Sequence, residues 1–203
     1  MDYTSVLSLL NHYLENEQVS LYVLLIHYVP DIVDYFSIPP RVQKIIETLY
    51  CKTFELKPFG LSETFMFGKL HGLHDNYAKK NLYGCWWYKC DLVHRDRNLP
   101  AIKTSIRTSW FRHGKLHRDN DLPAIDEEYL KKWYVDGKLH RDEGLPAVID
   151  KLKNMQQWYV NGVLHRDGGL PAVEDNYIKE WVEHGKFIRC ECLNMEKLFN
   201  INV

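Results

Sequence analysis

Two patterns of apolar residues divide the chain. Up to about residue 58, apolar side chains recur every three or four positions, as they do along one face of a helix. From there on, short β-prone runs alternate with turn residues. We therefore predict an α+β fold, with a small N-terminal helical domain over residues 1–58 and a repetitive antiparallel β-hairpin array over residues 59–203. The boundary is expected at Lys57–Gly60.

The N-terminal segment predicts three helices. Thr4–Ser5 is suited to cap the first, Val19–Val29 forms a second apolar stretch, and Pro39-Pro40 is suited to open the third. Two roles remain open for these helices. They either cap the first edge of the sheet or form a partner-binding module, such as an F-box-like adaptor without the expected Leu-Pro opening.

A repeat dominates the rest of the chain. The copy Trp133–Ala147 recurs with small changes at Trp87–Ala101, Trp110–Ala124 and Trp158–Ala172, at spacings of 23, 23 and 25 residues between the histidines. A fixed period of this length indicates a repeat architecture. A degenerate copy precedes these four around Phe67–Gly72, and another follows at Trp181–Arg189, as the ends of a stacked array require.

The repeated positions are structural candidates. The tryptophans are Trp87, Trp110, Trp133, Trp158 and Trp181; the histidines are His71, His94, His117, His140 and His165; the turn glycines are Gly68, Gly114, Gly137, Gly162 and Gly185. The tryptophans are either packing residues or an exposed aromatic stripe that binds a ligand, and both interpretations stay open at this point.

Each copy predicts a hairpin with a two-residue turn. Asp136-Gly137 lies between two short β-prone runs, and such dipeptides suit a turn in which both residues have positive φ. This turn places Tyr134 opposite Leu139 and Trp133 opposite His140, on the two faces of the hairpin. Leu-Pro-Ala should then begin a further extended run, and a variable polar link should lead to the next tryptophan.

The pattern Trp158-x-x-Asn161-Gly162-x-x-His165 resembles the MORN repeat. Phe67–Gly72 keeps the His-Gly ending of that family. The other copies have His-Arg-Asp and an added Leu-Pro-Ala, which is similar to repeats of giant-virus proteins. The resemblance covers roughly residues 64–190. It implies an elongated meandering β-sheet that serves as a scaffold or contact surface without chemistry of its own.

Composition narrows the functional classes. The net charge is −1, and neither part of the chain is strongly basic, which argues against a nucleic-acid partner. The N-terminus lacks the positive region of a signal peptide, and the apolar run Leu21–Ile26 is too short to span a bilayer. Five cysteines without a framework spacing suit a reducing compartment. We expect a cytoplasmic protein, in the host cytoplasm or the virion if it is viral.

The sequence argues against a kinase catalytic loop, a zinc site of histidines and a zinc site of cysteines. His-Arg-Asp occurs in kinase catalytic loops, but the other kinase motifs are missing and an active site needs one constellation rather than four copies. Histidines one repeat apart, about 10–14 Å, are too far apart to share a zinc ion. The pairs Cys85/Cys90 and Cys190/Cys192 could supply four thiolates to a zinc ion, but they lie at opposite ends of the array, too far apart to share one ion. We expect the arginine and aspartate to pair with each other or with a neighbouring copy, and each histidine to pack on its own tryptophan.

We therefore expect a non-enzymatic scaffold or protein-interaction protein with no cofactor and no metal. The partner is expected to be a protein of unknown identity. Homo-oligomers could form through the array ends or the N-terminal helices. The alternative is a membrane-surface or lipid-binding adaptor, against which the balanced charge argues. The C-terminal tail, Met195–Val203, is expected to cap the last hairpin.

Overall fold

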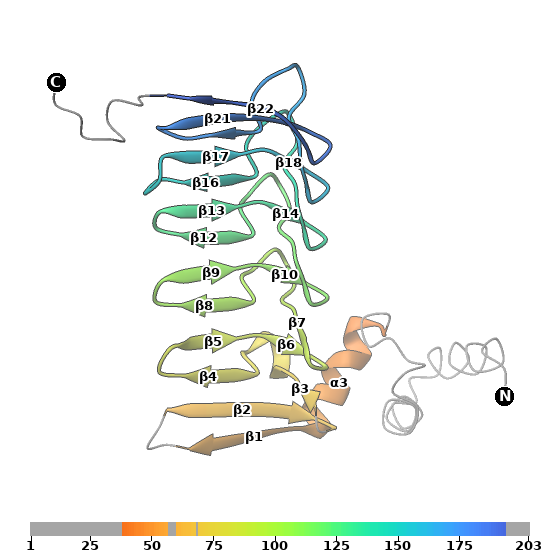
Figure 1. Cartoon of the computed structure of the whole chain (residues 1–203). Coiled ribbons are helices and arrows are strands. Elements are labelled where there is room, and N and C mark those ends of the chain that lie inside the picture. The colour runs from red at the N-terminus through yellow and green to blue at the C-terminus, as the bar shows by residue number, and fades with distance from the viewer. Residues whose placement is uncertain (1–37, 57–59, 68, 194–203) are drawn as a thin grey trace, which may run out of the picture. The chain divides into compact units, whose positions relative to one another are not determined.

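The computed structural model describes residues 38–56, 60–67 and 69–193. These residues form mostly antiparallel β-hairpins in a meander, which confirms the predicted array type (Figure 1). The chain divides into two compact units, Met1–Leu82 with Trp87–Leu92 and Tyr83–Trp86 with Val93–Val203. The first two predicted helices, Gly68 and the tail Met195–Val203 lie outside the described residues.

The first unit contains the one α-helix among the described residues. Its elements are α3 (Pro40–Tyr50), β1 (Cys51–Leu56), β2 (Leu61–Met66), β3 (Lys69–Leu70), the 3-10 helix η3 (Leu73–Asp75), β4 (Lys79–Asn81) and β6 (Tyr88–Lys89). Helix α3 begins with proline at its first position, as predicted, and packs against β1 and η3. Strand β2 pairs with β1, β3 and β4.

Strand β1 corrects the predicted extent of the helical segment. Cys51–Leu56 was placed with the helices, yet all six residues pair with Leu61–Met66. The hydroxyls of Thr53 and Thr64 lie 2.9 Å apart across this pair. Cross-strand pairing over the full strand thus decides the conformation of a segment too short to show a clear period.

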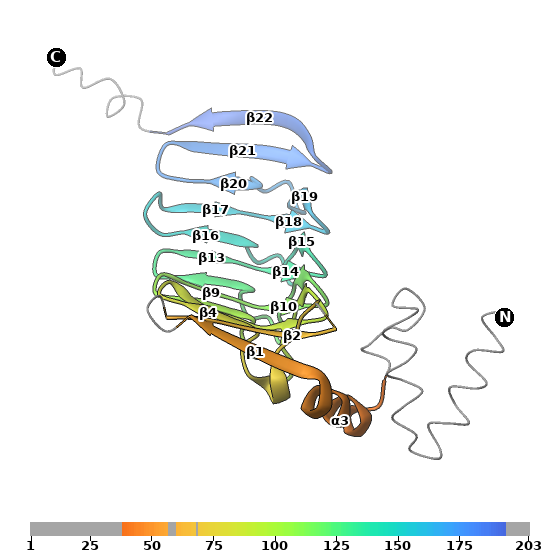
Figure 2. The ribbon, with the colours of Figure 1, turned by 90° about the horizontal axis from the view of Figure 1, so that it is seen from below.

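The second unit holds the main sheet. Its strands are β5 (Gly84–Trp86), β8 (Ile102–Thr104), β9 (Arg107–Ser109), β12 (Ile125–Glu127), β13 (Leu130–Lys132), β16 (Val148–Asp150), β17 (Met155–Gln157), β20 (Val173–Glu174), β21 (Ile178–Glu183) and β22 (Lys186–Cys192). They lie side by side in this order, and the pairs described are antiparallel (Figure 2). Strand β7 (Leu92–Val93) lies where the two units divide in sequence.

Three small hairpins accompany this sheet. They are β10–β11 (Phe111–Arg112 and Lys115–Leu116), β14–β15 (Tyr134–Val135 and Lys138–Leu139) and β18–β19 (Tyr159–Val160 and Val163–Leu164). Each is a separate two-stranded sheet, on the right of the main sheet in Figure 1. Tyr134 pairs with Leu139 as predicted. The predicted register is therefore confirmed, although these hairpins do not join one continuous sheet.

The polar segments predicted as links between copies form hairpins of the main sheet. Residues 126–132 were expected to connect two hairpins, but they form most of β12–β13, and Leu-Pro-Ala connects this hairpin to the preceding small one. The longer β16–β17 turn also explains the 25-residue period. The β16–β17 turn spans residues 151–154, whereas the β8–β9 and β12–β13 turns have two residues each. The two extra residues therefore extend a turn, where insertion disturbs little.

The core of the second unit repeats once per copy. The alanine of each Leu-Pro-Ala is completely buried, and the tryptophan that starts each small hairpin is nearly so: Ala101, Ala124, Ala147 and Ala172, with Trp110, Trp133 and Trp158. The backbone N–H of Trp133 donates to the carbonyl of Ala147 at 2.8 Å. Tryptophan and alanine of one copy thus pack where its small hairpin meets its main hairpin.

Candidate interaction surface

Each small turn is bonded to the preceding copy. Asp136 and Gly137 have φ values of 47° and 84°, as the predicted turn requires. The N–H of Asp136 donates to Nδ1 of His117 at 3.1 Å, and the N–H of Gly137 donates to the carbonyl of Leu116 at 2.8 Å. We call this pair of bonds the repeat junction. It recurs from His113-Gly114 to His94 and Val93, from Asn161-Gly162 to His140 and Leu139, and from His184-Gly185 to His165 and Leu164.

The junction determines the histidine tautomer. Because Nδ1 of His117 accepts a backbone N–H, the ring proton must lie on Nε2, which is 2.9 Å from Oδ1 of Asp119. Through its two ring nitrogens the imidazole links its own aspartate to the next turn. The same contact to the aspartate two residues on is made by His94, His140 and His165. The histidines join neighbouring copies through hydrogen bonds.

The arginine of His-Arg-Asp lies on the tryptophan of its own copy. Its guanidinium carbon is 3.5–4.0 Å from the ring centroid in the pairs Arg118/Trp110, Arg141/Trp133 and Arg166/Trp158. In the degenerate last copy, which lacks His-Arg-Asp, Arg189 lies over Trp181 in the same way, at 3.3 Å. The guanidinium also donates to the proline carbonyl of Leu-Pro-Ala, as Arg118 does to Pro123 at 3.1 Å. The expected pairing of arginine and aspartate within one motif is thus wrong: the aspartate binds the histidine, and the arginine binds an aromatic face and a carbonyl. The other expected pairing, with a neighbouring copy, occurs at Arg141, which binds Asp121.

Arg141 binds a carboxylate, whereas Arg118, at the same position one repeat earlier, does not. Arg141 donates from Nε and a terminal nitrogen to the two oxygens of Asp121, at 2.8 Å each, and this hydrogen-bonded guanidinium lowers the pKa of Asp121. Asn98 occupies the corresponding position one repeat earlier. Nε of Arg118 is buried without a hydrogen-bond partner, and burial lowers the pKa of Arg118. The array therefore contains a matched and an unmatched version of the same contact.

The first unit completes its histidine contact with the helix. His71 is completely buried, and its Nδ1 accepts the N–H of Cys90 at 3.2 Å. Its Nε2 lies 3.1 Å from Oε1 of Glu47, which belongs to α3 and is also buried. This degenerate copy has no His-Arg-Asp, so the carboxylate comes from the helix instead. Helix α3 is thus part of the first copy's hydrogen-bond network.

Burial lowers the reactivity of two of the cysteines. Burial raises the pKa values of Cys51 and Cys90 to about 12, and the Glu47 carboxylate contributes to both. Cys190 and Cys192 are exposed. Within residues 38–56, 60–67 and 69–193, no group of three or more His, Cys, Asp or Glu side chains is arranged to hold a metal ion.

The tryptophans are packing residues where the repeat is intact. Trp110, Trp133 and Trp158 are buried, and each indole N–H donates to a backbone carbonyl in the preceding loop: Asn98, Asp121 and Gly144. An exposed tryptophan stripe is therefore wrong for these copies.

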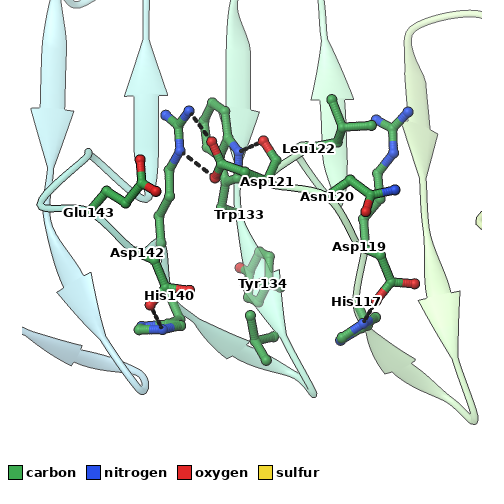
Figure 3. Close-up of a pocket in the computed structure, with 13 residues that line it drawn as sticks. His117, Asp119, Asn120, Asp121, Leu122, Trp133, Tyr134, His140, Asp142 and Glu143 are labelled. Atoms are coloured by element: carbon green, nitrogen blue, oxygen red, sulfur yellow. Dashed lines mark hydrogen bonds and ion pairs between the residues drawn. The ribbon is translucent and has the colours of Figure 1, made fainter.

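Three equivalent grooves lie between successive His-Arg-Asp loops. The central one has a volume of about 290 Å³ and is drawn in Figure 3. Tyr134 lies between the loops that begin at His117 and His140. Leu122 adds apolar surface, and the exposed carboxylate of Asp142 is on the wall. The groove is thus a shallow hollow with aromatic, apolar and acidic parts.

The flanking grooves repeat this lining one copy earlier and one copy later. The earlier one has a volume of about 120 Å³ and includes Leu99 and Phe111; the later one has about 210 Å³ and includes Leu145 and Tyr159. The pattern Trp-aromatic at each hairpin and Leu at each Leu-Pro-Ala could have indicated these positions. That the His-Arg-Asp loops stand apart as walls depends on contacts between copies, which no single copy reveals.

No known protein family, no curated protein and no solved structure matches this chain. Among the described residues, no helix is long and apolar enough to cross a membrane.

Proposed function

We propose that the chain is a non-enzymatic scaffold that binds a protein partner through repeated shallow contacts along the grooves. The observation that carries the proposal is the row of three grooves with equivalent linings in successive copies. Contacts repeated along one row act together, because binding in one groove raises the effective concentration at the next.

The use of the repeated polar side chains supports a structural role for the motif. The histidine and aspartate bind one another and the next turn, as in His117, Asp119 and Asp136. The arginine lies on the tryptophan and binds a carbonyl. Groups held by such contacts serve to join copies. The polar groups left for a partner include exposed side chains of the loops, such as Glu143, which lines two of the grooves.

The proposal is tested with leucines of the groove walls. Leu122 and Leu145 are partly exposed and line two neighbouring grooves. The variant L122K/L145K should keep the fold and lose the partner. Val163→Lys is the matched control, because Val163 lies outside the three grooves and the corresponding positions hold Lys115 and Lys138.

The chain and both variants serve as bait in native extract. A protein retained by the unmodified chain and by V163K, and lost with L122K/L145K, supports the proposal. Proteins retained equally by all three contradict it. Sedimentation with anionic liposomes at low and high salt tests the lipid-binding alternative, which predicts salt-sensitive binding without a protein partner.

A further inference from the structure

Large apolar side chains project from the turns of the main sheet. Ile106, Tyr129, Leu152 and Tyr177 lie in the turns of β8–β9, β12–β13, β16–β17 and β20–β21, at spacings of 23, 23 and 25 residues. Their exposed fractions are 79, 44, 75 and 45%. These four turns lie on the left of the main sheet in Figure 1, away from the small hairpins. We call them the apolar tips.

The tips form a ladder of regular spacing. Each copy adds two strands to the main sheet, and strands lie about 4.8 Å apart, so successive tips are separated by about 10 Å. Isolated apolar side chains on a surface need no explanation, but these four recur at the same repeat position, as does the exposed Tyr83 one period before Ile106. Such a row indicates an interaction surface.

The charge of the tips alternates along the ladder. The turn residues with their flanking strand ends carry +1 at 104–107 (Arg107), −2 at 127–130 (Glu127 and Glu128), +1 at 150–155 (Lys151 and Lys153 against Asp150) and −2 at 174–178 (Glu174 and Asp175). Within the chain, Arg107 pairs with Glu127 of the next tip. Neighbouring tips thus already attract one another.

We propose that the apolar tips bind a second copy of this chain in an antiparallel homodimer. A two-fold axis between the second and third tips places Ile106 opposite Tyr177 of the other copy, and Tyr129 opposite Leu152. Each contact then joins an aliphatic and an aromatic side chain, and each brings a tip of net charge +1 next to a tip of net charge −2. An interface of this kind is self-complementary, because every contact occurs twice.

Two features favour a second copy as the occupant. The other copy carries apolar side chains at the same spacing, so each of the four tips meets one, while Tyr83 lies beyond these four contacts. The charge order also selects the direction. In a parallel dimer with two-fold symmetry, like charges would face one another at every tip, and such contacts are unfavourable. This dimer uses the edge opposite the small hairpins, so it does not depend on the proposed function of the grooves.

Sedimentation velocity of the full chain over a range of concentrations tests the dimer. We expect a reversible change from one chain of 24.2 kDa to a dimer of twice that mass. The variants E127K/E128K and K151E/K153E each place like charges at two of the four contacts, and each should raise the dimer Kd by roughly tenfold or more. Their equimolar mixture should restore dimers, because the reversed tips then face each other with opposite charge.

The control variant K115E/K138E changes the charge of exposed lysines in the small hairpins and should leave the dimer Kd unchanged. Thermal unfolding of all variants checks that the fold is kept. A chain that stays monomeric up to its solubility limit would overturn the proposal, and the tips would then face another occupant. Equal weakening by the control, or a mixture of the two charge-reversal variants that forms no dimers, would also overturn it.

Discussion

Asn98→Asp should stabilise the protein, because it supplies the carboxylate that Arg118 lacks. Asp121 stands one repeat later and binds Arg141 through two 2.8 Å contacts. Asn98 and Asp121 share a positive φ, 54° and 50°, and their backbone carbonyls accept the indole N–H of a tryptophan in the same way. The two backbones therefore present this side chain in the same way. Oδ1 of Asn98 accepts the N–H of Asp119, so the carboxylate of the Asn98→Asp variant can keep that bond with one oxygen and offer the other to the buried Nε of Arg118.

The size of the gain follows from the contact it completes. A hydrogen bond to a charged group contributes about 1.5–3 kcal/mol, but an ion pair with an exposed carboxylate is worth about 1 kcal/mol or less. Since the corresponding Asp121 is about half exposed, we expect a gain near 1 kcal/mol. For a chain of this size, that raises the midpoint of thermal unfolding by roughly 2–4 °C.

Thermal and urea unfolding, followed by circular dichroism, measure this gain. The same substitution in an Arg118→Met background is the control, because the gain should vanish without the guanidinium. No gain from N98D, or an equal gain in both backgrounds, would refute the reasoning.

Acid should abolish the gain. Arg141 lowers the pKa of Asp121, and the new carboxylate should be affected by Arg118 in the same sense. A carboxyl whose pKa is lower in the folded state stabilises fully above its unfolded pKa of about 3.9, and loses the contribution as pH falls through the folded value. The difference between N98D and the unmodified chain should therefore be constant near neutral pH, decline as pH falls below about 4, and vanish once pH is below the folded-state pKa.

Three further predictions concern the junction, the turn and the thiols. His165→Gln should lower the midpoint of thermal unfolding more than His165→Asn. The Asn side-chain oxygen can replace Nδ1 as the acceptor for the N–H of His184, whereas the Gln amide extends toward the position of Nε2. Equal midpoints for the two variants would contradict the repeat junction. Gly137→Val should lower stability by about 1–3 kcal/mol more than Asp136→Asn, since only the former forces a β-branched residue to positive φ; similar urea midpoints would exclude the two-residue turn. Alkylation with iodoacetamide at about pH 8 should modify the two exposed C-terminal cysteines well before Cys51 and Cys90, as mass spectrometry of peptides can show; preferential labelling of the buried pair would contradict the raised pKa values.

Features determined within one copy could be predicted from the sequence. Asp136-Gly137 implied the turn, and the turn alone determined that Tyr134 pairs with Leu139. Pro39-Pro40 likewise marked the start of α3, because proline suits the first turn of a helix. Each of these inferences needs only neighbouring residues.

Features that depend on contacts between two copies could not be predicted from the sequence. His117 receives its second hydrogen bond from Asp136, which is 19 residues away, so its contact was expected with the wrong partner. The polar residues 126–132 resembled a link because strands that are only partly buried need no apolar pattern. The apolar tips were equally hidden, since one exposed Tyr129 or Leu152 becomes informative only when the copies are stacked.

Amide hydrogen exchange at the first residue of the repeated two-residue turns tests the central claim, that these turns are bonded to the preceding copy. In an isolated two-residue turn this N–H faces solvent and exchanges freely. Here the N–H groups of Asp136, Asn161 and His184 donate to the histidine of the preceding copy. We predict that these amides exchange as slowly as the paired strand amides of β12–β13, and that His165→Gln accelerates the exchange at His184 alone. Rapid exchange at all three positions in the folded protein would contradict the repeat junction.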